Sequence, residues 1–223
     1  MREIILDTET TGLDPKDGHR IVEIGCLELV DRVWTGRTYQ QYINPDRAMT
    51  EDAYRVHGIS DEMLADKPRF NQIADAFLDF VDGATIVAHN ATFDMRFINW
   101  ELNNAGREPL PMDKVVDTLA IARKKYPGAA SSLDALCRRF EVDNTDRTLH
   151  GALIDSRLLA DVYYHLMGAK QAGLELVSGG GGAGGAQERA YREPRPHAAP
   201  EADLENHRSF LESFVSDPIW SRG

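Results

Sequence analysis

The first part of the chain alternates between short apolar runs and turn residues, a pattern typical of strands. The run Glu3–Glu9 has three consecutive apolar residues at positions 4–6 and predicts a central strand buried on both faces. Two further runs, 20–30 and 37–43, alternate or are mostly apolar, and turn residues separate them. Together the three runs predict an antiparallel strand meander.

Apolar residues at helical spacing follow these runs. Pro68–Val81 is predicted to form an amphipathic helix and Thr85–Ala88 a short buried strand. Ser131 and Asp134 have the spacing of a capping box at a helix start. Further helices are predicted over residues 92–103, 117–125, 132–140 and 152–167. This order predicts an α/β fold in which a mixed sheet, the antiparallel meander plus parallel strands, is flanked by helices.

The composition changes sharply at SGGGGAGGA, residues 178–186. Such a run buries no side chains and loses much backbone entropy on ordering, which predicts a flexible linker. Because no strand, helix or lysine adjoins it, the run is a poor match to a phosphate-binding loop. The predicted organisation is a folded domain (1–170), a short peptide (171–176), a Gly/Pro-rich flexible linker (177–202) and an amphipathic segment (203–223).

The formal net charge of −11 argues against binding nucleic acid or anionic lipid by bulk electrostatics. An acidic protein that acts on phosphodiesters needs local positive charge, and bound divalent cations supply it. Cys26 and Cys137 lie in apolar segments without zinc-site spacing and are predicted to be reduced core residues. No stretch approaches the roughly 18 apolar residues of a membrane span, and the N-terminus is unlike a signal peptide. We therefore expect a soluble cytoplasmic protein with no membrane partner.

Carboxylates stand out at three places in this pattern. Asp7 and Glu9, two residues apart on one strand, point to the same side, either as a solvated strand end or as ligands of a shared Mg²⁺ or Mn²⁺. Asp94 is expected in the first turn of a helix, where the helix dipole alone could favour an acid. Asp155 is expected on the apolar side of its helix, where an unpaired carboxylate is costly and needs a cation. His150 lies just before that helix, where a histidine is often only a surface or capping residue.

The contexts of these residues are LDTETTGLD, AHNATFDMRF and HGALIDSRLLADVY. They resemble the Exo I, Exo II and Exo III motifs of the DEDDh 3′→5′ exonucleases. The resemblance covers about residues 2–177, and all five catalytic positions match. It implies an RNase H-like fold and removal of mispaired 3′-terminal nucleotides as a proofreading subunit of a replicative DNA polymerase.

The resemblance also implies roles for individual residues. Asp7, Glu9 and Asp155 would hold one of two divalent cations, Mg²⁺ or Mn²⁺. Asp7 would bridge to the second cation, and Asp94 would complete that side directly or through water. His150 would act as general base, since a histidine is largely neutral at working pH.

The substrate in this interpretation is a DNA 3′ end, single-stranded or frayed. Thr10 and Leu13 follow the Exo I motif, where the last base would be held. Val56-His57-Gly58-Ile59 resembles the family loop that lies against the terminal nucleotide, although His57 could be an ordinary loop histidine beside a glycine turn. His89 is interpreted as structural or as supporting the metal ligands, and His165 as a polar position of the last helix.

Two tail segments resemble partner-binding elements. Gln171–Leu176 resembles the peptide by which polymerase subunits dock into the bacterial sliding clamp, although it could be an ordinary helix end. The segment 203–223 predicts an amphipathic helix, because Leu204, His207, Phe210, Leu211, Phe214 and Val215 recur at three- to four-residue spacing. By resemblance its partner is the polymerase catalytic (alpha) subunit at a nucleoid-associated replisome; alternatively the helix folds back on the nuclease domain.

Two other functions stay open. The catalytic residues do not distinguish DNA from RNA, so an RNase or oligoribonuclease is the first alternative. The tail argues against it, because a free-standing RNase has no evident use for a clamp-like peptide and an apolar terminal helix. A non-catalytic polymerase scaffold is the second alternative, and the presence of every catalytic carboxylate argues against it.

Overall fold

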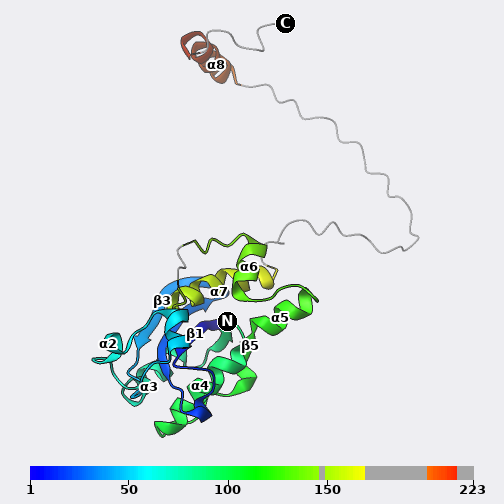
Figure 1. The fold of residues 1–223 in the computed structure, drawn as a ribbon. Coiled ribbons are helices and arrows are strands. Elements are labelled where there is room, and N and C mark those ends of the chain that lie inside the picture. Colours follow the sequence, from blue (N-terminus) through cyan, green and yellow to red (C-terminus); the bar gives the residue numbers. More distant parts are fainter. Residues whose placement is uncertain (146–148, 169–199, 215–223) are drawn as a thin grey trace, which may run out of the picture. The chain divides into compact units, whose positions relative to one another are not determined.

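The computed structural model describes residues 1–145, 149–168 and 200–214 (Figure 1). The chain divides into two compact units, Met1–Leu176 and Val177–Gly223, which are described separately. The clamp-like peptide 171–176 and most of the linker 177–202 lie outside the described residues.

A five-stranded mixed sheet forms the centre of the first unit. Its strands are β1 (Arg2–Thr10), β2 (Ile21–Val30), β3 (Val33–Tyr42), β4 (Thr85–Ala88) and β5 (Val115–Asp117). They lie in the order β3-β2-β1-β4-β5, with antiparallel pairing in the first three and parallel pairing of β4 with β1 and with β5. The predicted meander, central first strand and mixed sheet are confirmed.

Two features of the sheet were predicted wrongly. Strand β3 begins at Val33 rather than at the predicted Arg37. The prediction started late because the first residues of β3 are exposed and carry no alternating apolar pattern. Strand β5 was missed, and Asp117 was assigned to a helix. Asp117 instead ends β5 and caps the next helix, since its side chain accepts hydrogen bonds from the amides of Leu119 and Ala120.

Helices pack around this sheet and extend into the tail. They are α1 (Glu51–His57), α2 (Asp61–Leu64), α3 (Phe70–Val81), α4 (Ala91–Asn104), α5 (Thr118–Lys125), α6 (Leu133–Phe140), α7 (Ala152–Leu166) and α8 (Glu201–Phe214). Two 3-10 turns, η1 (Pro15–Asp17) and η2 (Met112–Lys114), complete the elements. The helices predicted around α3 to α7 are present, with ends that differ by one or two residues.

The segment around His57 differs from the predicted loop. His57 is the last residue of α1, and Gly58 ends that helix in the left-handed region at φ +69°. Helices α1 and α2 were missed because they are short and mostly exposed. The cap of α6 was placed one residue early, since the side chain of Ser132, not Ser131, accepts from the amide of Ala135 at 3.3 Å.

The alternating residues of β1 pack into different cores. Ile4 and Leu6 belong to the core that includes residues of α3 and α4, whereas Ile5 packs with Leu159 and Tyr163 of α7. Helix α7 also packs on α5 and α6 through a third cluster. Cys26 and Cys137 are buried core residues, as predicted. Because successive side chains of β1 point to opposite faces of the sheet, the position of each polar residue along β1 determines which helices it can contact.

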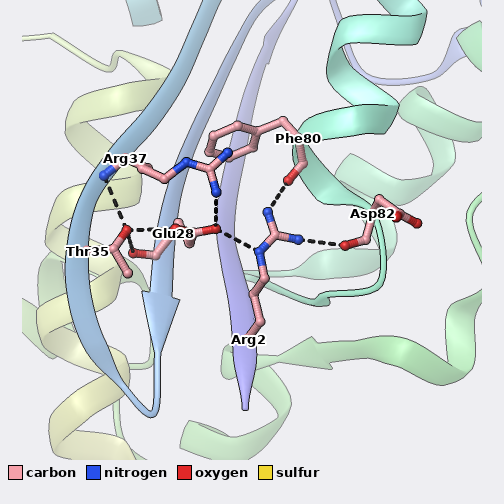
Figure 2. A network of polar contacts seen from close by, with 6 residues as sticks. All are labelled: Arg2, Glu28, Thr35, Arg37, Phe80 and Asp82. Atoms are coloured by element: carbon pink, nitrogen blue, oxygen red, sulfur yellow. Dashed lines mark hydrogen bonds and ion pairs between the residues drawn. The ribbon is translucent and has the colours of Figure 1, made fainter.

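A polar network joins the strands at the end of the sheet where β1 begins. Figure 2 shows Glu28 of β2 bound by the Arg2 guanidinium at 2.7 Å, the Arg37 guanidinium at 2.8 Å and the Thr35 hydroxyl at 2.8 Å. Arg2 also donates to the carbonyls of Phe80 and Asp82 near the end of α3. The hydrogen bond from Arg2, more than any other contact, lowers the pKa of Glu28, and burial opposes it.

The described part of the second unit is helix α8. Its apolar residues Leu204 and Phe210 are about half exposed, at 50% and 55%. Val215 and the remainder of the segment 203–223 lie outside the described residues. In the described parts of the chain, no helix has the length and apolar character needed to span a membrane.

Candidate active site

Asp7 and Glu9 lie at the end of β1, on the face covered by α7. They share the alternation of Glu3 and Ile5, and the buried Glu3 carboxylate accepts a hydrogen bond from the Tyr163 hydroxyl of α7 at 2.7 Å. Glu9 is 8% exposed, whereas Asp7 is partly exposed. The predicted common orientation of the two carboxylates therefore directs them toward the start of α7.

Helix α7 brings Asp155 and His150 to the same place. Asp155 occupies the first turn of α7 and is 3% exposed, and its Oδ2 lies 3.0 Å from His150 Nδ1. The amide of His150 donates to the carbonyl of Val56 in α1 at 3.1 Å, which ties the histidine to a second element. Potential ligand atoms of Glu9, His150 and Asp155 all lie within 4.8 Å of one another. Residues from the two ends of the first unit thus form one cluster.

The His150–Asp155 contact has a consequence for the imidazole. An ionised carboxylate can only accept hydrogen bonds, so His150 Nδ1 donates to it. In a neutral imidazole, Nε2 is then the nitrogen with a lone pair. The side chain of His150 is 45% exposed, so solvent can approach it. This arrangement is suited to accepting a proton from water.

The first turn of α7 packs on strand β2, next to the two carboxylates of β1. Glu23 is the cross-strand partner of Glu9, and its Oε2 accepts from the amide of Ala152 at 3.0 Å. Gly25 is the cross-strand partner of Asp7, and a Cβ there would lie 2.2 Å from backbone atoms of α7. The Ser156 hydroxyl donates to the Gly25 carbonyl at 2.9 Å. These contacts set the distance between α7 and the Asp7–Glu9 pair.

Asp94 reaches the same end of β1 through helix α4. Thr8, which alternates with Asp7 and Glu9 along the strand, donates its hydroxyl hydrogen to Asp94 Oδ1 at 2.8 Å. Asp94 is 3% exposed, and burial raises the pKa of its carboxyl to about 7, although the hydrogen bond from Thr8 opposes the shift. A nearby divalent cation would favour the ionised carboxylate and lower that pKa.

A cavity of about 510 Å³ opens beside Glu9. The three predicted substrate-binding residues, Thr10, Leu13 and His57, all line it. Leu13 is 79% exposed, whereas Thr10 and His57 are buried. The structure therefore brings together the residues that the sequence assigned to the terminal nucleotide.

The tautomer of His57 is set by its own helix end. The amide of Ile59 donates to His57 Nδ1 at 3.1 Å, so Nε2 carries the hydrogen of the neutral ring. Burial lowers the pKa of His57, an effect that the Thr10 carbonyl partly offsets. Within the described residues, the buried Nε2 has no hydrogen-bond partner.

A second cavity, of about 400 Å³, adjoins Asp7, His150 and Asp155 on another side. His89 lines it, and His89 Nδ1 lies 2.9 Å from the Thr118 hydroxyl oxygen, in keeping with the structural role inferred for it. His165 lies at the opposite end of α7 from Asp155, where its ring stacks on Phe140 with centroids 5.2 Å apart.

Sequence reasoning missed the residues that hold α7 in place. Glu23, Gly25 and Ser156 form the contacts described above, yet none was singled out. An acid within the apolar run IVEIG was the available signal, because a glutamate inside a buried strand needs a partner.

The comparisons with known proteins agree with this geometry. The sequence model of the exonuclease family, RNase_T, matches residues 4–163. The chain belongs to this exonuclease family. The predicted RNase H-like fold is confirmed by solved structures such as the nuclease domain of 3′hExo, a DEDDh family member bound to rAMP. That structure has a TM-score of 0.65 and 19% identity, over 74% of this chain and 91% of the other.

Other relatives are closer in sequence. The DNA polymerase III subunit epsilon of Rickettsia felis is 54% identical over 180 residues, which are 79% of each chain. Exonuclease X, solved in complex with 5′ overhanging duplex DNA, is 29% identical with a TM-score of 0.59, over 75% of this chain and 92% of the other. The predicted resemblance to DEDDh exonucleases is therefore confirmed.

Proposed function

We propose that this chain hydrolyses the 3′-terminal phosphodiester bond of a single-stranded or frayed DNA end and releases nucleoside 5′-monophosphates, as the proofreading subunit of a replicative DNA polymerase. The observation that carries the proposal is the convergence of Glu9, His150 and Asp155 within 4.8 Å, beside Asp7 and a nucleotide-sized cavity. The high similarity to polymerase III epsilon subunits supports the proofreading role.

The donor set fits divalent cations. Carboxylate oxygens are the ligands that Mg²⁺ and Mn²⁺ prefer, and three of the four acids are largely buried. Asp7, Glu9 and Asp155 would hold one ion, Asp7 would also contact a second, and Asp94 would complete that side directly or through water. When bound, the two ions supply the positive charge that stabilises the attacking and leaving oxygens of an in-line displacement.

The protein's own groups perform the remaining tasks. His150 Nε2 takes the proton of the attacking water, while the Asp155 carboxylate keeps Nδ1 protonated and orients the ring. Thr10, Leu13 and His57 hold the terminal nucleotide in the cavity beside Glu9.

Mononucleotide release from a 3′-labelled single-stranded DNA and from the matched RNA tests this function. We expect release with Mg²⁺ or Mn²⁺, none with EDTA, and none from Asp7→Ala. Asp113→Ala, which removes an exposed carboxylate of η2, is the matched control and retains activity. Preference for RNA would favour the RNase alternative, and no activity on either strand would favour the scaffold.

We further propose that the tail attaches the nuclease to the replisome in the cytoplasm. Gln171–Leu176 would bind the sliding clamp, and residues 203–223 would bind the polymerase catalytic subunit. The half-exposed Leu204 and Phe210 of α8 support a partner-binding role for that helix.

Two experiments separate these contacts from catalysis. Changing Gln171 and Leu174 to Ala is expected to weaken clamp binding and to leave nuclease activity intact; unchanged clamp affinity would contradict the first assignment. Deleting residues 203–223 is expected to abolish co-purification with the polymerase. Retained co-purification would count against the second assignment.

A further inference from the structure

The carboxylate cluster adjoins two cavities, and no described residue lines both of them. The cavity of about 510 Å³ includes Glu9 and extends along α1 and the β1–β2 loop. The cavity of about 400 Å³ includes Asp7 and Asp155 and extends to α5 and the start of α6. Because Glu9 and Asp155 have potential ligand atoms within 4.8 Å of each other, the two cavities meet at the cluster from different sides.

The linings of the two cavities differ in charge. Among the described residues, no lysine or arginine lines the cavity beside Glu9, and Asp17 and Asp52 add further negative charge to it. The cavity beside Asp7 also holds three carboxylates, those of Asp7, Asp134 and Asp155, but it contains Arg123 together with the hydroxyls of Ser131 and Ser132. The first suits an uncharged nucleoside, whereas the second offers a cation and hydroxyl donors to an anion.

A nucleic-acid strand cut at its last bond has the same division of charge. The terminal nucleoside is uncharged, and the phosphate that is cleaved lies at the carboxylate cluster. Each nucleotide on the 5′ side carries one phosphate. Since the protein has a net charge of −11, that part of the strand needs a local cation.

Arg123 is available for such a contact. It is an exposed residue in the last turn of α5, and no described residue forms an ion pair or hydrogen bond with it. Its neighbour Lys125 donates instead to the Leu166 carbonyl, and Arg139 lies over the Tyr126 ring. His89, in the same cavity, adds no further cation near neutral pH, because burial lowers its pKa.

We propose that the cavity of Asp7, Arg123 and Ser131 binds the phosphodiester on the 5′ side of the bond being cut, and that Arg123 is its phosphate ligand. This subsite rests on the proposed nuclease function. It gives the strand a direction across the protein, from α5 and α6, past the carboxylates, to the cavity of His57.

Two substrates separate this subsite from the rest of the site. One is a single-stranded oligodeoxynucleotide. The other is the p-nitrophenyl ester of thymidine 5′-monophosphate, which has the terminal nucleotide and the cleaved phosphate but no upstream nucleotide. For Arg123→Ala we expect KM for the oligonucleotide to rise about tenfold, as for one lost charge-assisted hydrogen bond. The KM for the ester should rise less than about twofold.

Salt dependence provides a second measurement. Loss of one single-strand phosphate contact is expected to reduce the slope of log(kcat/KM) against log[salt] by about 0.7 for the oligonucleotide. Lys124→Ala is the matched control, because it removes the same charge from the adjacent exposed residue, which does not line the cavity. Arg123→Lys is expected to recover part of the affinity, since a lysine keeps the charge but not the planar fork.

The outcomes separate a failure of the nuclease function from a failure of the subsite alone. A wild-type protein that hydrolyses neither substrate with Mg²⁺ or Mn²⁺ would overturn the nuclease function and the subsite with it. A wild-type protein that hydrolyses both, with Arg123→Ala reducing both equally or matching Lys124→Ala, would overturn only the subsite. A rise in KM for the oligonucleotide alone, together with a reduced salt slope, would establish the subsite.

Discussion

The glycine at position 25 allows the helix that carries Asp155 to approach the sheet. A Cβ at this position would lie 2.2 Å from the Ala152 carbonyl carbon and from the Leu153 nitrogen, both of them backbone atoms. Backbone at a helix start cannot turn aside as a flexible side chain can. Gly25→Ala therefore has to push α7 away from β2.

The size of the displacement follows from the contact distance. Ordinary van der Waals contact begins near 3.4 Å, so the helix start must move by the difference from 2.2 Å, about 1.2 Å if α7 alone gives way. His150 and Asp155 would then move away from Glu9 on β1. A misplacement of about 1 Å can reduce catalysis about 100-fold, and overpacking of this kind costs about 1–3 kcal/mol of stability.

Three measurements on Gly25→Ala test this reasoning, namely kcat on single-stranded DNA, Mn²⁺ affinity by titration calorimetry, and thermal unfolding. We expect kcat to fall about 100-fold and Mn²⁺ to bind more weakly in a protein that still folds. Gly151→Ala is the matched control, because a Cβ there meets nothing closer than the Ile154 side chain at 3.8 Å and the backbone is extended.

Activity and Mn²⁺ affinity of Gly25→Ala within twofold of the wild type would refute the reasoning. That result would mean that the sheet or the helix absorbs the added methyl group without moving the carboxylates apart. A large loss in Gly151→Ala as well would show that any substitution near the helix start is damaging, independent of the close approach.

Three further predictions concern buried polar groups outside the cluster. Tyr163→Phe removes the hydroxyl that donates to the fully buried Glu3, so denaturant unfolding should show a loss of about 1–3 kcal/mol; an unchanged stability would contradict this. Glu101→Ala leaves Arg20 without its two-point partner and should cost about 3 kcal/mol by the same assay, near the lower end for a buried pair because Arg20 is 30% exposed. The pKa of Glu28 is lowered in the folded state, so its ionised form stabilises the fold above the ordinary value of 4.5, and this stability is lost as pH falls below 4.5 toward the folded pKa. Glu28→Gln should therefore flatten the pH dependence of the unfolding temperature below about pH 4.5, and an unaltered acid limb would argue against it.

The parts of the fold that could be predicted are those with a strong apolar signal. Three consecutive apolar residues placed β1 at the centre of the sheet, and the helical spacing of Leu158, Leu159, Val162 and Leu166 predicted α7. Strand β3 is an edge strand whose exposed start has no such pattern, and β5 has three residues. Short exposed elements carry little apolar periodicity, so the sequence alone did not reveal them.

The residues of the site also fall into those that the sequence could reveal and those that it could not. The carboxylates could be singled out because each contradicts its local apolar pattern or matches a motif. The roles of Glu23 and Gly25 depend on the register that pairs them with Glu9 and Asp7, and a register is a property of two strands together. Arg123 lies on a polar helix end, where a basic residue is ordinary, so it gained significance only from the cavity that it lines.

The docking of α7 on β2 joins parts of the chain that are synthesised far apart in time. The contact between Ala152 and Glu23 spans 129 positions, and the contact between Ser156 and Gly25 spans 131. At roughly 5–20 residues per second on the ribosome, the segment with Asp7 and Glu9 waits for many seconds before Asp155 is made. A nascent or truncated chain without α7 therefore has Asp7 and Glu9 but lacks Asp155, and we expect it to have no nuclease activity until this last domain helix folds.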